Sequence, residues 1–191
     1  DRSRQSFANE YITSPLLGAL YLAFDVTRPP FDDARVRRAF SHAIDREAVA
    51  GVTLRGYYAP ATGGMVPPGL PGHLPGIAPP YDPAEAKRLI GEAGYGDGAQ
   101  FPEIECLCPS HLALEPVSQH LKSQWLQRLG VSVEWHSLEW SSFLSRMTRQ
   151  RPNLWLSGWA ADYPDPDTFL RVAVLHDFGE VWENAEYLEL V

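Results

Sequence analysis

The chain has 191 residues and a mass of 21.3 kDa, enough for an ordinary domain with a sizeable core and too much for a disulfide-stapled miniprotein. Hydrophobic residues make up 45% and charged residues 21%, a balance typical of folded chains and not of disordered ones. The formal net charge is −8 and no Lys- or Arg-rich run offsets it, so nucleic acid is not an expected partner. The longest apolar stretch, residues 16–24, is about half of the roughly 20 residues that a membrane-spanning helix needs. No direct membrane span is therefore expected.

The first part of the chain is predicted to contain one strand and two short helices. Residues 1–15 are polar without a clear period and are expected to form an approach segment. The apolar and aromatic run at 20–24, bounded by an aspartate and a pair of prolines, favours a buried strand. From Asp32, apolar residues recur at helical spacing, and Asp32 can cap that helix. Asp45 can cap a second helix, which Gly56 is expected to stop.

Residues 57–83 contain eight prolines and five glycines. Proline lacks a backbone donor and interrupts both helices and sheets, so regular structure is nearly impossible here. Several apolar side chains, among them Met65 and Leu70, can still anchor the segment. We expect a long irregular loop that packs over the surface and joins two parts of one domain.

The rest of the chain alternates predicted helices and strands. A capping box with proline at the first helical position, residues 82–85, starts a helix that ends at Gly94. A strand, helix, strand, helix and strand are then expected at 104–107, 112–129, 131–135, 140–147 and 154–156. This alternation predicts an α/β fold with a mostly parallel sheet flanked by helices. Further helices are expected at 169–174 and from Glu186, where the abrupt end suggests a piece of a longer protein.

The two cysteines, Cys106 and Cys108, lie two residues apart in an expected strand. Their side chains would leave the same face while the strand holds their backbones apart, so a mutual disulfide would be strained. We expect two buried free thiols.

The residue patterns argue against an enzyme, a metal site or a cofactor site. The six histidines show no i, i+4 pair, there is no Cys-x-x-Cys, and the aspartates at 162–167 lack the glycine and distal glutamate of a calcium loop. Ser41, His42 and Asp45 cannot form a nucleophilic triad, because neighbouring positions on a helix point apart. No nucleophile elbow or phosphate-binding glycine loop is present.

The segment 157–166 is the strongest candidate for binding. It follows the expected strand 154–156 and supplies an indole, Trp159, and a carboxylate, Asp162. In open α/β sheets, ligands bind beyond the carboxyl ends of the strands. An ionised Asp facing an ammonium group gains about 1.5 to 3 kcal/mol. In the alternative interpretation Trp159 belongs to the core and Asp162 holds the turn, and the residues alone do not decide between the two.

Nine segments resemble, in the same order, the family 5 solute-binding proteins of peptide and nickel ABC importers. The match runs from about residue 20 to the end, and its last segment reads Trp-Ala-Ala-Asp-Tyr-Pro-Asp-Pro. The segments are residues 21–25, 30–40, 43–47, 67–69, 81–87, 92–95, 129–131, 139–140 and 159–166. The resemblance implies that residues 1–191 form a single α/β lobe, the C-terminal lobe of a type II periplasmic-binding-protein-like clamshell, with the other lobe outside this sequence.

The resemblance also implies the site residues. Asp162 resembles the carboxylate that takes a peptide's α-ammonium group, Trp159 and Trp140 resemble aromatic residues of the cleft, and His111 falls near a position that can face the ligand. One departure concerns residues 154–157, Leu-Trp-Leu-Ser, where some peptide binders place an arginine for a ligand carboxylate. The preferred peptide length therefore stays open.

The expected function is capture of a peptide, or another small cationic solute, in the cleft between two lobes. The resemblance implies an extracytoplasmic protein, periplasmic or lipid-anchored, that is a monomer, has no cofactor and delivers its solute to the membrane permease of an ABC importer. The alternative is a sensory ligand-binding module fused to a regulatory or signalling domain, which residues upstream of Asp1 would distinguish.

Overall fold

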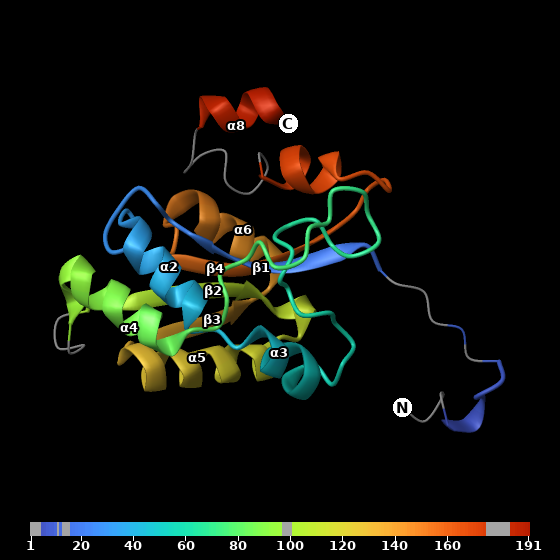
Figure 1. Cartoon of the computed structure of the whole chain (residues 1–191), viewed down its shortest axis with the longest axis horizontal. Helices are drawn as coiled ribbons and strands as arrows, with labels where there is room; N and C mark the ends of the chain where they lie inside the picture. The colour runs from blue at the N-terminus through green and yellow to red at the C-terminus, as the bar shows by residue number, and fades with distance from the viewer. Residues whose placement is uncertain (1–4, 11, 13–15, 97–100, 175–183) are drawn as a thin grey trace.

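The computed structural model describes residues 5–10, 12, 16–96, 101–174 and 184–191. Its strands are β1 (Gly18–Phe24), β2 (Ile104–Pro109), β3 (Val133–Leu138) and β4 (Leu154–Ala160). They form one four-stranded sheet in the order β1-β4-β2-β3 (Figure 1). β2 pairs in parallel with both β3 and β4, whereas β1 lies antiparallel to β4. The predicted α/β fold with a mostly parallel sheet is confirmed.

Helices cover both faces of the sheet (Figure 1). The parallel strands are connected through α5 (Glu115–Leu129), between β2 and β3, and α6 (Trp140–Arg149), between β3 and β4. The first crossover runs from β2 to its neighbour β3 at the edge of the sheet, and the second runs back from β3 past β2 to β4. Because right-handed crossovers in opposite directions use opposite faces, α5 and α6 lie on opposite sides of the sheet. On the α5 side lie also α2 (Ala34–His42), α3 (Arg46–Ala48) and α4 (Pro83–Ile90).

Acidic side chains cap several helices. Asp82 caps α4 as predicted, its carboxylate accepting two backbone N–H groups at 3.1 and 3.0 Å. The reciprocal bond of the predicted capping box is absent, because the Asp82 backbone N–H donates to the His42 carbonyl and Glu85 pairs with Arg88. Asp45 caps α3, and η1 (Val49–Thr53) continues that segment. The cap expected at Asp32 is wrong: residue 32 lies in a turn, and Asp33 has the extended backbone of an N-cap and accepts from the Arg35 backbone N–H.

The last strand is longer than predicted. β4 continues from residue 156 to Ala160, because β1 pairs with it along its whole length and places Ala19 opposite Trp159. Trp159 therefore lies within the sheet and not beyond it. Asp162 follows two residues after the strand ends.

Pairing and backbone conformation also shift other boundaries. The strand expected at 131–135 lies at 133–138, in parallel register with β2, which itself runs two residues further than predicted. The helix expected at 112–129 begins at Glu115, because Ala113 has a positive φ of 49° that ends the preceding turn, η3 (Ser110–Leu112).

The last two predicted helices are η4 (Thr168–Ala173) and α8 (Ala185–Leu190). Of the approach segment expected at 1–15, only 5–10 and 12 are described, and they are exposed.

Each face of the sheet carries its own apolar core. On the α5 side, Phe40 and Trp125 are fully buried, and the Trp125 indole Nε1 donates to the Phe40 carbonyl at 3.1 Å. On the α6 side, Tyr21, Phe143 and Trp155 form a smaller cluster. Burial of each such side chain contributes about 1.5 to 3 kcal/mol. The described part of the chain has no helix with the length and apolar character needed to cross a bilayer.

The structure has no helix or strand between Thr53 and Pro83, as the prolines and glycines predict. The loop is packed by its own apolar side chains: Val66 and Leu70 are buried against Phe169 of η4. Gly69, with a φ of +99°, allows the turn that directs Leu70 inward. The loop lies beside the end of β4.

The thiols of Cys106 and Cys108 are free and buried, as predicted. Burial raises the pKa of Cys108 to about 11 and also raises the pKa of Cys106. Because the thiolate is the reactive form and roughly one Cys108 in a thousand is ionised at pH 8, we expect a chromogenic disulfide reagent to label the native chain at least ~100-fold more slowly than the chain in urea. Rapid labelling of the native chain at pH 8 would contradict the burial of these side chains.

Candidate functional site

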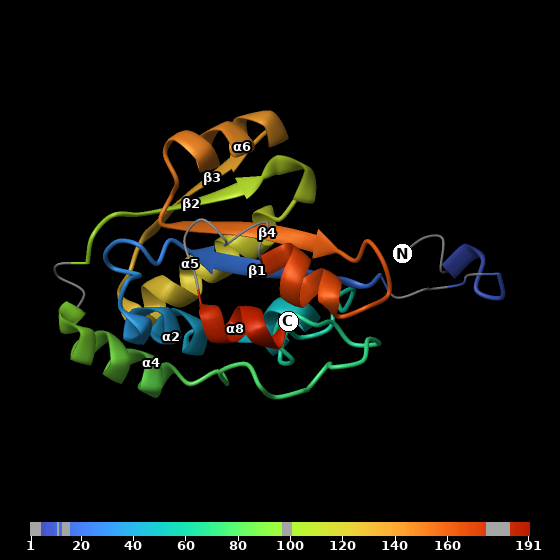
Figure 2. The same ribbon diagram turned by 90° about the horizontal axis from the view of Figure 1, so that it is seen from above.

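The four predicted site residues lie at the carboxyl ends of the three parallel strands. His111 follows β2 in η3, Trp140 follows β3 as the first residue of α6, and Trp159 and Asp162 lie near and beyond the end of β4. Parallel strands point the same way, as the arrowheads of β2 and β4 show in Figure 2. Residues that are far apart in the sequence therefore lie along one edge of the sheet.

Trp140 and His111 are in direct contact. Their ring centroids lie 5.5 Å apart with an interplanar angle of 82°, an edge-to-face arrangement. Trp140 also stacks on the buried ring of Phe143, at 5.6 Å and 15°. Trp140 is 44% exposed, so this anchored indole keeps an open face. The structure thus brings these two predicted residues together.

The first turn of α6 holds Trp140 in place. The Glu139 carboxylate accepts from the backbone N–H and the hydroxyl of Ser141, at 2.8 and 2.5 Å. These hydrogen bonds favour the ionised form and lower the pKa of Glu139. Capping by a charged side chain rigidifies the turn that carries the indole.

Trp159 is half-buried and belongs partly to the core. Its ring contacts the cluster around Trp155 and also the cluster around Phe169, and Met65 of the long loop packs in both. Its indole Nε1 donates to the Thr168 hydroxyl at 3.1 Å. The core interpretation of Trp159 is thus right for part of the side chain, while the rest stays accessible.

Asp162 is exposed. Its backbone N–H donates to the Thr168 hydroxyl at 3.4 Å, and its Oδ2 accepts from the same hydroxyl at 3.4 Å. Among the described residues, no Lys, Arg or His side chain forms an ion pair with Asp162. This carboxylate is therefore open to a cation from outside the described part of the chain.

Other side chains hold the acidic turn. Asp165 Oδ1 accepts from the Asp167 backbone N–H at 2.9 Å, and Asp167 forms an ion pair with Arg171 at 2.6 Å. The hydrogen bonds from Arg171 and then from Tyr163 lower the pKa of Asp167. Within the described ranges, no three His, Cys, Asp or Glu side chains are grouped closely enough to hold a metal ion.

The sequence did not predict that two further residues, Thr168 and Met65, support this edge. Thr168 is fully buried and bonds to both Trp159 and Asp162, and Met65 of the loop packs against the same two apolar clusters as Trp159. The one sequence signal that could have indicated Thr168 is its hydroxyl side chain directly before the apolar pair Phe169-Leu170. Nothing in the sequence connects Met65 to residues almost a hundred positions later.

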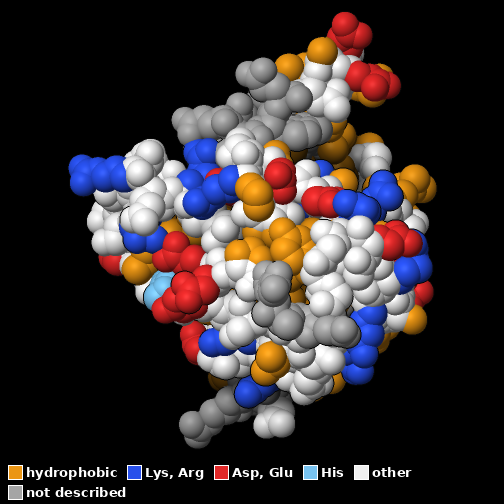
Figure 3. Space-filling view, turned by 90° about the vertical axis from the view of Figure 1, so that its left-hand side faces the viewer, with side chains coloured by type: hydrophobic (Ala, Val, Ile, Leu, Met, Phe, Trp, Pro, Cys, Tyr) orange, Lys and Arg blue, Asp and Glu red, His pale blue; other side chains and the backbone are white. Residues whose placement is uncertain are grey.

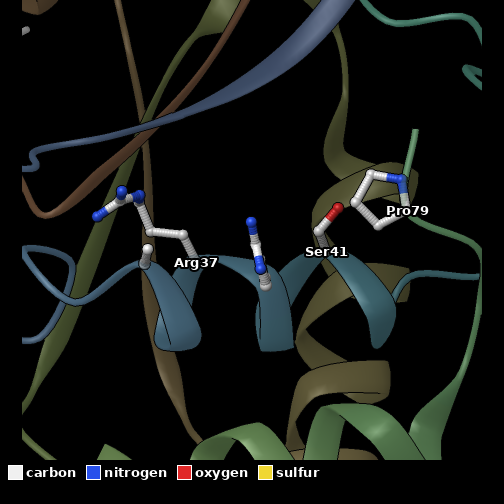
Figure 4. Close-up of a pocket in the computed structure, with 5 residues that line it drawn as sticks. Arg37, Ser41 and Pro79 are labelled. Atoms are coloured by element: carbon white, nitrogen blue, oxygen red, sulfur yellow. The ribbon is translucent and has the colours of Figure 1, made fainter. Parts of the chain in front are cut away.

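A second surface feature lies on α2, away from the edge that carries the predicted site residues. Ala34, Arg37, Arg38, Ser41 and Pro79 line a shallow hollow of about 300 Å³ on α2 (Figure 4). Two of its polar groups already have intramolecular partners, because Arg37 donates to the Phe31 and Asp32 carbonyls and the Ser41 hydroxyl accepts from Arg46. None of the predicted site residues lines it.

The charged side chains do not form a field of one sign on the face shown in Figure 3. Acidic and basic groups alternate there around a central apolar area. A protein that binds nucleic acid needs a continuous basic surface, which this face does not provide.

Comparison with known proteins finds a family model that matches most of this chain. The family model "Bacterial extracellular solute-binding proteins, family 5 Middle" matches residues 2–177. The glutathione-binding protein GsiB of Salmonella typhimurium is 38% identical over 125 residues, which are 65% of this chain and 23% of that protein. The oligopeptide-binding protein OppA of Bacillus subtilis is 26% identical over 187 residues, 93% of this chain and 34% of that protein.

Solved structures agree with the sequence comparison. The murein tripeptide binding protein MppA of Escherichia coli matches with a TM-score of 0.83 and 26% identity, over 99% of this chain and 39% of that one. A dipeptide binding protein from Pseudoalteromonas sp. SM9913, in complex with Met-Leu, matches with a TM-score of 0.78 and 29% identity, over 98% and 39% of the two chains. The chain therefore spans between 23% and 39% of the length of these relatives.

The exposure of Asp162 makes a prediction about stability. Because its carboxylate is exposed and its bond to Thr168 is long, we expect Asp162→Asn to change the free energy of unfolding by less than about 0.5 kcal/mol in urea titrations. Asp25 is the matched control: it is 5% exposed and accepts from Thr27 and Arg28 at 2.5 to 3.1 Å. Asp25→Asn should cost about 1 to 3 kcal/mol. Equal losses for both variants would assign Asp162 to the scaffold.

Proposed function

This chain belongs to the bacterial extracellular solute-binding proteins of family 5, a family of binding proteins and not of enzymes, and on that premise we propose that it is a ligand-binding lobe that captures peptides for an ABC importer. The observation that carries the proposal is the exposed Asp162 carboxylate, which lies beside a half-buried indole at the carboxyl edge of the sheet. A peptide's N-terminal ammonium group is the cation that this pair suits.

The chemistry of the edge supports an ammonium ligand. A charge-assisted hydrogen bond from ammonium to carboxylate is worth about 1.5 to 3 kcal/mol, and more as water is excluded. Trp159 supplies an apolar surface beside the acid, and the pair Trp140 and His111 supplies a second aromatic surface on the same edge. Aromatic faces contact peptide side chains with little demand on their identity.

The relatives support a peptide as the ligand class. The four relatives described above carry names that state binding of oligopeptides, a murein tripeptide, a dipeptide and glutathione. Each of these ligands combines an ammonium group with amide bonds. We propose that a second lobe closes over this edge and captures the ligand between the two, because the chain spans only a fraction of such relatives. We also propose that the protein acts as a monomer outside the cytoplasm and delivers its solute to a membrane permease.

The test is isothermal titration calorimetry of the full-length gene product. The ligands are alanine peptides of two to five residues, each with a free or an acetylated N-terminus. We expect Asp162→Ala to weaken binding of the free peptides by about 3 kcal/mol, roughly 150-fold, if the closed site excludes water. Acetylation of the peptide should weaken binding by the wild type and should have little further effect in Asp162→Ala, because both changes remove the same bond.

Asp32→Ala is the control, since Asp32 is an exposed carboxylate beside α2 and away from this edge. Its affinities should equal those of the wild type. Unchanged affinity in Asp162→Ala, or equal binding of free and acetylated peptides by the wild type, would contradict the proposal.

A further inference from the structure

The hydroxyl of Thr168 is where Trp159 and Asp162 meet. The Trp159 indole Nε1 donates to Thr168 Oγ1 at 3.1 Å, and the Asp162 backbone N–H donates to the same oxygen at 3.4 Å. The Thr168 hydroxyl in turn donates to Asp162 Oδ2 at 3.4 Å. One atom thus connects the aromatic and the acidic group of the proposed site.

These three contacts use the full capacity of a hydroxyl group. A threonine hydroxyl has one proton and two lone pairs. The lone pairs accept from the indole and from the Asp162 backbone, so the proton is left for the carboxylate. The direction of each bond is therefore determined.

The core holds Thr168 itself in place. Thr168 is fully buried as the first residue of η4, and its backbone N–H donates to the Asp165 carbonyl at 3.3 Å. The next residue, Phe169, is fully buried against Val66 and Leu70 of the long loop. A β-branched side chain has few rotamers, and here the surrounding packing leaves it little freedom.

We propose that Thr168 is a positioning residue of the ligand site, whose hydroxyl holds the Trp159 indole and the Asp162 carboxylate in fixed relative orientation for a ligand ammonium group. The inference rests on the proposed function. Thr168 is fully buried and acts through its two partners, without touching the ligand. A carboxylate that is already oriented loses less conformational entropy on binding.

Two substitutions separate the hydroxyl from the shape of the side chain. Thr168→Val keeps the volume and branching and removes the hydroxyl, whereas Thr168→Ser keeps the hydroxyl and removes a methyl group. We expect Thr168→Val to weaken binding of trialanine by about 5- to 30-fold, and Thr168→Ser to stay within about threefold of the wild type. Isothermal titration calorimetry of the full-length gene product measures the affinity of both variants.

The effect should depend on Asp162. In an Asp162→Asn background we expect the further loss caused by Thr168→Val to be clearly smaller, because the amide has replaced the charged acceptor. Equal losses in both backgrounds, or a Thr168→Ser variant as weak as Thr168→Val, would overturn the assignment and leave Thr168 with a packing role.

A measurement without ligand separates this inference from the proposed function. In ¹⁵N-labelled protein, the indole N–H signal of Trp159 is identified by its absence in Trp159→Phe. We expect this signal to shift and to exchange faster with solvent in Thr168→Val, and to stay close to its wild-type position in Thr168→Ser. If Thr168→Val does not fold, Thr168→Ala serves for the same comparison.

The outcomes are distinct. An unmoved Trp159 indole signal overturns the positioning role, whether or not peptides bind. Failure of the wild type to bind any peptide, together with a shifted indole signal, overturns the proposed function and with it the role of Thr168 toward a ligand, while the hydrogen bond itself stands.

Discussion

The pairing of β1 with β4 is the constraint on which the candidate site depends. Seven residues of each strand pair antiparallel, from Phe24 opposite Leu154 to Gly18 opposite Ala160. The pairing continues beyond the strand, where the Ala161 backbone N–H donates to the Leu17 carbonyl at 2.8 Å. Without β1, the last residues of β4 would lose the backbone hydrogen bonds that hold them in the sheet. The positions of Trp159 and Asp162 would then no longer be defined.

The site is graded from a rigid interior to an open rim. Thr168 is fully buried, Trp159 is half-buried and Asp162 is exposed, and the Thr168 hydroxyl is hydrogen-bonded to both of the others. Close-packed interiors resist displacement, so the core transmits its rigidity to an acid that has few contacts of its own. The proline-rich loop belongs to this support, because Met65 and Val66 pack beneath the same edge.

The sequence predicted much of the fold because the relevant signals are local. Helix caps, proline and glycine positions, and apolar periodicity act within a few residues, and they located α4, α5, α6 and the long loop. Boundaries failed where a distant partner decides them. β4 runs to Ala160 because of β1, and β3 is displaced by its register with β2, although 23 residues, 110–132, separate these last two strands.

The sequence by itself determined the residue types of the candidate site and the family resemblance, because both can be recognised from the order of residues along the chain. Only the tertiary structure decided that His111 lies against Trp140, that Trp159 is part of the sheet and that a buried threonine links it to Asp162. The physical reason is that parallel strands bring their carboxyl ends together whatever their separation in sequence. Contacts across that edge therefore depend on strand order and register, which no local pattern specifies.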